Sequence, residues 1–330
     1  MALFLRRRNL VTTVGLAALC SPTAWAQIPP STWPQRPIRW IVSQPAGAGP
    51  DIIARYVSEQ LARNIGQPIV VENRPGGQNL IGAQAAARAT PDGYSFFYGT
   101  AAAMVTNVHT FKSLPYDPES DFVPVVLVGK SPFIVAASGA SGFKNLSDAL
   151  NQAMAQPSIV TIATEGSKTF SGMLADSIAA MAGIKLNHVP YSKASDAIHD
   201  AIAGRVALIC LPAAALTPYI KSGQIMPLAI SSAVRLASLP SIATLAETFA
   251  GFEFTGWNGL FAPAGTPTEA VLRINRELVA ILAKPEVVAR LLALGSVAET
   301  GMSPASFASF IKAERIRWAG TAKAIGINPE

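Results

Sequence analysis

The chain has 330 residues, half of which are hydrophobic, and its formal net charge is +6. This charge is too mild for a typical nucleic-acid-binding protein, and no cluster of Lys and Arg follows residue 8. The length and the apolar content allow two domains of about 150 residues, each with a sizeable core.

Residues 1–26 have the pattern of an export signal. Three arginines, Arg6 to Arg8, precede an apolar stretch over residues 10–19, and Ala24-Trp25-Ala26 forms a cleavage site before Gln27. The apolar stretch is too short to span a bilayer stably. We expect cleavage near Ala26, which removes three arginines and lowers the charge to +3. A membrane-anchored N-terminus is the alternative, and the pattern decides neither for Sec nor for twin-arginine export.

One cysteine, Cys210, remains after this cleavage. It lies in the apolar run 206–211, which predicts a buried strand. An intrachain disulfide is therefore impossible, and a thiol nucleophile is not expected in such a run.

The first elements of the mature chain enclose a loop of small residues. An apolar strand at 38–42 is followed by Pro45-Ala46-Gly47-Ala48-Gly49, and a helix is expected from Asp51 to residue 64. Free backbone N–H groups and the positive end of a helix dipole then meet at one place. The sequence thus predicts an anion site here.

Strands and helices continue to alternate, which predicts α/β layers with mainly parallel sheets. A strand at 69–73, a helix at 81–89 and a strand at 94–98 complete the first unit, and Gly99-Thr100-Ala101-Ala102 forms a second loop of small residues. A long strand or strand pair at 123–137 then leads away from this unit.

A second α/β series follows from residue 158. The pattern predicts strands at 158–163, 186–190, 206–211 and 226–231, and helices at 166–182, 194–203 and 213–221. Residues 254–263 return to the first unit, before helices at 268–282, 285–294 and 304–322. Two crossings between two units predict a hinged clamp, with lobe 1 formed by 27–128 and 250–330 and lobe 2 by 129–249.

Other kinds of site find little support. Gly47-Ala48-Gly49 begins like a dinucleotide fingerprint with Glu72 as the acidic partner, but Ile52 replaces the third glycine. A simple tight turn is the other alternative for this loop. The histidines His109, His188 and His199 show no metal-ligand spacing, and no G-x-S-x-G elbow exists.

The second series carries its own candidate residues. Gly166-Ser167 follows a strand and opens a helix, so Ser167 either caps that helix or donates to a ligand. Asp200 is unusual on an apolar helix and either faces solvent or points into the cleft. Tyr191 follows a strand and either lines the cleft or covers the core.

Taken together, an ordered set of motifs resembles the Bug receptors, the solute-binding proteins of tripartite tricarboxylate transporters. It covers essentially the whole mature chain and consists of Pro37-Ile38, Pro45-Ala46-Gly47, Asp51 with residues 52–55, residues 71–76, 89–94, 114–117, 121–124, 189–191, Leu239-Pro240, Trp257 and residues 262–267.

The resemblance implies a two-lobed periplasmic binding protein (type II) that closes on a carboxylated small molecule. In the family, the loop matching 45–51 and the turn matching 99–107 hold one carboxylate, partly through waters, and the second lobe adds further contacts. The expected ligand-binding residues are Gln44, Ala46, Gly47, Ala48, Asp51, Thr100, Ala102, Asn107, Gly166, Ser167, Phe170, Tyr191 and Asp200.

The chain also departs from the family pattern beside the expected pocket. Gln44 replaces an aromatic residue, and Phe170 stands where the family often has His, which favours a partly apolar or aromatic acid. We expect a monomeric periplasmic receptor without cofactor or metal. Its partners are a carboxylated solute and either membrane transporter subunits or a sensor protein. An exported enzyme on the same scaffold is the alternative.

Overall fold

The first strand and helix show how the sequence pattern builds this protein. The computed structural model describes residues 33–166 and 168–329. β1 (Ile38–Val42) is almost wholly buried, and α1 (Gly49–Ile65) follows it. Pro50 lies in the first turn of α1, where its missing N–H leaves no helical bond unmade, and Gly66 ends the helix with φ of 70°.

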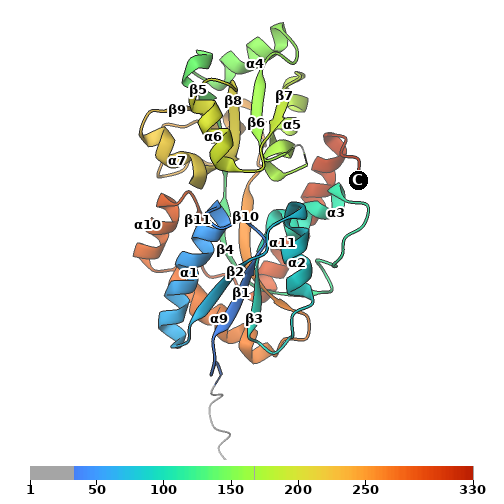
Figure 1. Ribbon diagram of the computed structural model, residues 1–330, viewed down its shortest axis with the longest axis vertical. Helices are drawn as coiled ribbons and strands as arrows, with labels where there is room; N and C mark the ends of the chain where they lie inside the picture. Colours follow the sequence, from blue (N-terminus) through green and yellow to red (C-terminus); the bar gives the residue numbers. More distant parts are fainter. Residues whose placement is uncertain (1–32, 167, 330) are drawn as a thin grey trace, which may run out of the picture. The chain divides into compact units, whose positions relative to one another are not determined.

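Six strands form the first sheet, in the order β11-β4-β10-β3-β1-β2 (Figure 1). Strand β1 pairs in parallel with both β2 and β3, whereas β10 runs antiparallel to β3 and β4, and β11 antiparallel to β4. The bounds are β2 Ile69–Asn73, β3 Ser95–Thr100, β4 Phe122–Ser131, β10 Gly256–Pro263 and β11 Val297–Ala298.

The second sheet has five strands in the order β7-β6-β8-β5-β9. Strand β6 pairs in parallel with β7 and β8, while β5 runs antiparallel to β8 and β9. The bounds are β5 Phe133–Ser138, β6 Thr161–Thr164, β7 Asn187–Pro190, β8 Leu208–Pro212 and β9 Ile225–Ile230.

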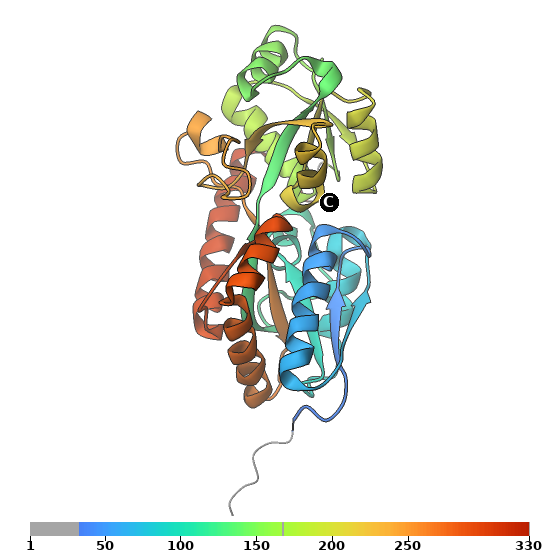
Figure 2. The same cartoon turned by 90° about the vertical axis from the view of Figure 1, so that its left-hand side faces the viewer.

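The expected α/β architecture with two sheets is confirmed, but both sheets are mixed rather than mainly parallel. The antiparallel pairs involve the strands that carry the chain between the sheets. Only Pro132 separates β4 from β5, and Figure 2 shows the two as a nearly continuous green run. The chain returns through Glu253, Phe254 and Thr255 into β10. The predicted strand pair at 123–137 and the return at 254–263 are thus both present.

Helices cover both faces of each sheet. Helix α1 contacts α9 on one face of the first sheet, and α2 and α11 share a hydrophobic cluster on the other (Figure 1). In the second sheet, α4 and α5 belong to that same cluster, whereas α6 and α7 pack with a second cluster. The helices are α2 Leu80–Ala87, α3 Asn107–Thr110, α4 Leu146–Ala155, α5 Phe170–Ala182, α6 Ala194–Ile202, α7 Ala213–Lys221, α8 Leu245–Thr248, α9 Thr268–Leu282, α10 Pro285–Ala293 and α11 Pro304–Ala324.

The start of α5 differs from the expectation. The helix begins at Phe170 rather than at 166, and its cap is Thr169, whose side chain accepts a hydrogen bond from the Gly172 N–H. The sequence left open whether Ser167 caps this helix or donates to a ligand, and the cap is instead Thr169, a later hydroxyl in the turn that reaches the free N–H groups of the helix.

Residues 34–330 form one compact unit. The lobe boundaries at 128/129 and 249/250 stay a prediction, and the predicted signal at 1–26 lies outside the described residues. In the described part of the chain, no helix is both long and apolar enough to cross a membrane.

Candidate functional site

The predicted site residues gather at two sheet edges. In the first sheet, the loop 43–48 follows β1, Thr100 ends β3, and Ala102 lies in the turn after β3. In the second, Gly166 follows β6 and Tyr191 follows β7. These are the carboxyl ends of parallel strands, which is where α/β sheets usually bind ligands.

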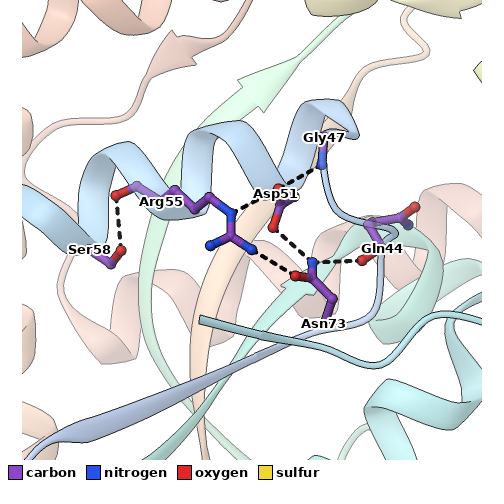
Figure 3. Close-up of polar contacts among 6 residues, drawn as sticks. All are labelled: Gln44, Gly47, Asp51, Arg55, Ser58 and Asn73. Atoms are coloured by element: carbon purple, nitrogen blue, oxygen red, sulfur yellow. Dashed lines mark hydrogen bonds and ion pairs between the residues drawn. The ribbon is translucent and has the colours of Figure 1, made fainter. Parts of the chain in front are cut away.

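Hydrogen bonds to Asp51 hold the loop 43–48, which we call the first loop (Figure 3). Its Oδ2 accepts hydrogen bonds from the Gly47 N–H at 2.8 Å and from Arg55 Nε at 3.0 Å. Its Oδ1 accepts from Asn73 Nδ2 at 2.8 Å, and the same amide nitrogen donates to the Gln44 carbonyl at 2.9 Å. The Asp51 carboxylate is therefore engaged in holding the loop between Gln44 and Gly47.

Burial and hydrogen bonding shift the pKa of the Asp51 carboxyl in opposite directions. Only 1% of the residue is exposed, and this burial alone would raise the pKa of its carboxyl. The hydrogen bonds from Arg55, Asn73 and Gly47 outweigh burial and hold the pKa below its usual value. The carboxylate is thus ionised at neutral pH and keeps its three partners.

Asp51 leaves several N–H groups of the loop available. The Ala48 N–H donates to the Pro45 carbonyl, and Ala48 itself supplies no side-chain cap to α1. Within residues 33–166 and 168–329, no protein group accepts a hydrogen bond from the N–H of Ala46, Gly49 or Asp51. These donors lie at the positive end of a helix of 17 residues, so the loop can bind an anion without a basic side chain.

Other predicted site residues near the ends of β1 and β3 have contacts within the protein. Thr100 Oγ1 accepts from the Ala103 N–H at 3.4 Å, and Ala102 opens the π-helical turn η2 (Ala102–Thr106). Asn107 is buried and donates from Nδ2 to the Gln78 carbonyl at 3.0 Å. The side chain of Gln44 donates to Asn79 Oδ1. The structure gives Thr100, Asn107 and Gln44 local partners, and their contact with a solute stays a prediction.

Phe170 lies in an aromatic cluster rather than on an open surface. Its ring centroid is 4.9 Å from that of Phe133, 4.7 Å from Phe254 and 5.2 Å from Trp318. The cluster joins α5 to α11 and to both chain crossings. Ser167 lies outside the described residues.

Asp200 and Tyr191 form a pair within the second sheet and its helices. The Tyr191 hydroxyl donates to Asp200 Oδ2 at 2.7 Å, and Arg205 Nη1 donates to Oδ1 at 2.6 Å. These two bonds hold the pKa of Asp200 below its usual value. Both carboxylate oxygens therefore have protein partners, and the role of the two residues in solute binding stays a prediction.

The two sheet edges meet at the start of α1. A Cβ atom added at Gly49 would lie 3.6 Å from Ala214 Cβ and 4.0 Å from Pro212 Cβ, both at the end of β8 and the start of α7. A Cβ added at Gly295 would lie 2.3 Å from the Ala214 nitrogen. The loop with free N–H groups thus lies against the carboxyl edge of the second sheet.

Glu72 and Cys210, the residues considered for other chemistries, have structural surroundings. Glu72, the acidic partner expected for a dinucleotide, forms ion pairs with Arg39 and Arg74. Burial raises the pKa of the Cys210 thiol, as expected for an inert core cysteine. Among residues 33–166 and 168–329, no three His, Cys, Asp or Glu side chains are grouped to hold a metal ion.

Sequence reasoning gave no role to three residues that the structure places at these edges. Asn73 donates hydrogen bonds to Asp51 and to the Gln44 carbonyl, and its position as the last residue of β2 was the available signal. Asn79 accepts from Ser43 and Gln44, and its φ of 80° could not be read from the chain. Glu165 follows β6 directly, at the same edge as Gly166.

The lowered pKa of Asp51 predicts that its contribution to the stability of the fold is lost at acidic pH. A carboxyl with a lowered pKa stabilises the fold above its unfolded pKa, and this contribution is lost as the pH falls through its folded pKa. We expect the advantage of the wild type over Asp51→Asn in melting temperature to shrink as the pH falls below about 4. Thermal unfolding of both proteins across this range tests it, and a difference independent of pH would contradict it.

The family comparison gives one consistent result. A model of the "Tripartite tricarboxylate transporter family receptor" matches residues 53–327. The chain is 34% identical to a UPF0065 protein of Bordetella bronchiseptica, over 98% of this chain and 94% of the relative. It is 30% identical to Protein BugT of Bordetella pertussis, over 96% of this chain and 95% of the relative.

Solved structures agree with this result. The fold is similar to that of R. palustris Rpa4515 with adipate, with a TM-score of 0.86, 29% identity, and 90% of this chain and 100% of that chain covered. It is also similar to MatC (Rpa3494) from Rhodopseudomonas palustris with bound malate, with a TM-score of 0.80, 27% identity, and coverage of 88% and 100%.

Proposed function

Because this chain belongs to the tripartite tricarboxylate transporter receptor family, a family of solute-binding receptors, we propose that its first loop binds one carboxylate of a small organic acid. The N–H groups of Ala46, Gly49 and Asp51 are the donors of this site. Gly166, Tyr191 and the neighbouring residues of the second sheet cover the solute. The chain acts as a receptor and performs no chemistry on it.

A single observation carries this proposal, namely that an ionised, buried Asp51 holds a loop in which the N–H groups of Ala46, Gly49 and Asp51 have no acceptor among the described residues. Asp51 faces Gly47, Arg55 and Asn73 and leaves the start of α1 to an external anion. The adipate and malate held by two similar proteins have the chemistry that such a loop recognises.

The proposal also includes the cellular location of the receptor. The N-terminal signal pattern directs the chain to the periplasm, with cleavage near Ala26. There the closed, loaded receptor presents its solute to membrane transporter subunits. The ligand favours the closed form only by its higher affinity for that form.

A thermal-shift and calorimetry experiment tests the proposal. The purified protein is unfolded and refolded to remove bound solute, and adipate and malate are added separately. We expect at least one of them to raise the melting temperature by mass action. Folded protein that responds to neither these two acids nor a wider panel of carboxylates would contradict the receptor assignment.

Asp51→Ala links that result to the loop. We expect the variant to lose about tenfold in affinity for the responding acid, equivalent to about 1.4 kcal/mol. Glu59→Ala is the control, because Glu59 is an exposed residue of the same helix that pairs with Arg63. If Asp51→Ala and Glu59→Ala bind the acid with equal affinity, Asp51 has no role in the binding site.

A further inference from the structure

Glu165 lies at the edge of the second sheet that the first loop approaches. Strands β6 and β8 are parallel neighbours, with Ile162 opposite Leu208 and Ala163 opposite Ile209. This register places Glu165 level with Leu211, one residue before Pro212. Neighbouring strands are about 4.8 Å apart, so the Glu165 backbone lies one strand away from the end of β8.

The end of β8 is also where α1 begins. Gly49 lies against Pro212 and Ala214, as the distances from its added Cβ show. The free N–H groups of Gly49 and Asp51 and the residue Glu165 therefore border the same region between the two sheet edges. We take a solute whose carboxylate binds the start of α1 to extend from there toward Glu165.

The Glu165 carboxylate has no compensating partner in the described part of the chain. Among the described residues, none forms a hydrogen bond or ion pair with it. Its backbone is fixed, because the Glu165 N–H donates to Ser171 Oγ at 2.9 Å. The neighbouring Lys168 directs its Nζ to the Asn328 carbonyl at 3.1 Å.

The surroundings of Glu165 disfavour an isolated negative charge. Glu165 is exposed to solvent, yet it is surrounded by enough protein atoms that partial desolvation raises the pKa of its carboxyl to about 7. A hydrogen-bond donor beside the carboxylate would relieve this cost, whereas a second negative charge would increase it.

We propose that Glu165 selects the solute: it favours carboxylic acids whose other end carries a hydrogen-bond donor, an ammonium or a hydroxyl, and disfavours acids with a second carboxylate there. This inference rests on the proposed function, because it takes the first carboxylate to be bound by the loop at α1. Repulsion between like charges in a crowded site rejects the wrong ligand, and pairing with the donor retains the right one.

A matched set of ligands tests the proposal. Adipate, 6-aminohexanoate, 6-hydroxyhexanoate and hexanoate share one carboxylate and one chain length and differ at the far end. Succinate, 4-aminobutanoate, 4-hydroxybutanoate and butanoate repeat the comparison with a shorter chain. Calorimetry at about pH 8, above the pKa of Glu165, gives the affinity of each acid for the wild type, Glu165→Gln and Glu286→Gln. Glu286 is an exposed acid on α10 and serves as the charge-matched control.

We expect the wild type to bind the amino or hydroxy acid of one series at least about tenfold more tightly than the diacid. In Glu165→Gln this ratio falls about tenfold, because the diacid gains affinity and the amino acid loses it, while Glu286→Gln matches the wild type. Comparing the affinities of the amino acid and the hydroxy acid of each series identifies which hydrogen-bond donor Glu165 prefers.

Two other results separate the possible failures. If the acids bind but the ratio is the same in wild type and Glu165→Gln, the role of Glu165 is overturned and the receptor assignment stands. If no acid of either series, nor malate, nor any acid of the wider carboxylate panel binds the folded wild type, the proposed function fails and the inference falls with it.

Discussion

Replacing Glu314 with alanine is expected to lower the free energy of unfolding by about 3 kcal/mol. Glu314 on α11 is buried and accepts a hydrogen bond from Trp257 Nε1 at 3.0 Å. Arg317 donates to the same carboxylate from Nε and Nη2, and its Nη1 donates to the Glu253 carbonyl at 2.7 Å. The variant leaves a buried indole N–H and a guanidinium without this acceptor.

The position of this cluster gives the substitution a second effect. Glu253 and Trp257 border the segment that returns the chain from the second sheet to the first, and α11 holds both ends. We therefore expect the crossing to loosen when Glu314 is lost. Chemical denaturation measures the stability, and hydrogen exchange of the amides at 253–257 measures the local opening.

Two variants make the test specific. Glu314→Gln retains an acceptor for Trp257 and should lose less stability than Glu314→Ala. Ser309→Ala removes an exposed side chain from the same helix, and its effect should stay within about 0.5 kcal/mol. If Glu314→Ala were as stable as Ser309→Ala, the cluster would contribute nothing to the crossing.

Gly295→Ala is expected to weaken solute binding about a hundredfold, equivalent to about 3 kcal/mol. Gly295 follows α10, and its added Cβ would lie 2.3 Å from the nitrogen and 2.7 Å from the Cα of Ala214. These are backbone atoms at the start of α7, so they cannot rotate away as a side chain would. The elements of the first and second sheets must separate at this point, which opposes closure over a solute.

The control for this prediction is Gly301→Ala. Gly295 has φ of 76° and Gly301 has φ of 79°, so both alanines incur a similar backbone cost of about 1–2 kcal/mol. No atom lies within 4 Å of a Cβ added at Gly301. Calorimetry with the acid that the wild type binds best should show the loss in Gly295→Ala alone. Equal affinities of the two variants would show that the contact with Ala214 has no part in closure.

The sequence indicated most elements because their patterns are local. Helices α7 and α9 and strand β2 have the bounds that apolar spacing and flanking turn residues predicted. The start of α5 was misplaced because Ser167 and Thr169 are both plausible caps, and only the path of the turn selects Thr169. The antiparallel strands were missed because strand direction depends on partners distant in sequence.

In the candidate site too, local features could be predicted from the sequence, whereas contacts between distant residues could not. The spacing of small residues before Asp51 predicted a loop that opens a helix, since backbone freedom and helix polarity are properties of a short segment. The role of Asp51 as the support of that loop depends on Asn73, which is 22 residues away. Phe170 was predicted beside a pocket, yet its surroundings are set by Phe254 and Trp318 from later parts of the chain.

The sequence by itself therefore determined the α/β class, the loop of small residues that opens α1 and the family of receptors. These follow from local periodicity, glycine placement and an ordered set of motifs. The tertiary structure decided which side chains support the loop, where the two sheets touch at Gly49, Gly295 and Ala214, and that Glu165 lies level with that contact. Contacts of this kind depend on packing between segments that the chain brings together only when it folds.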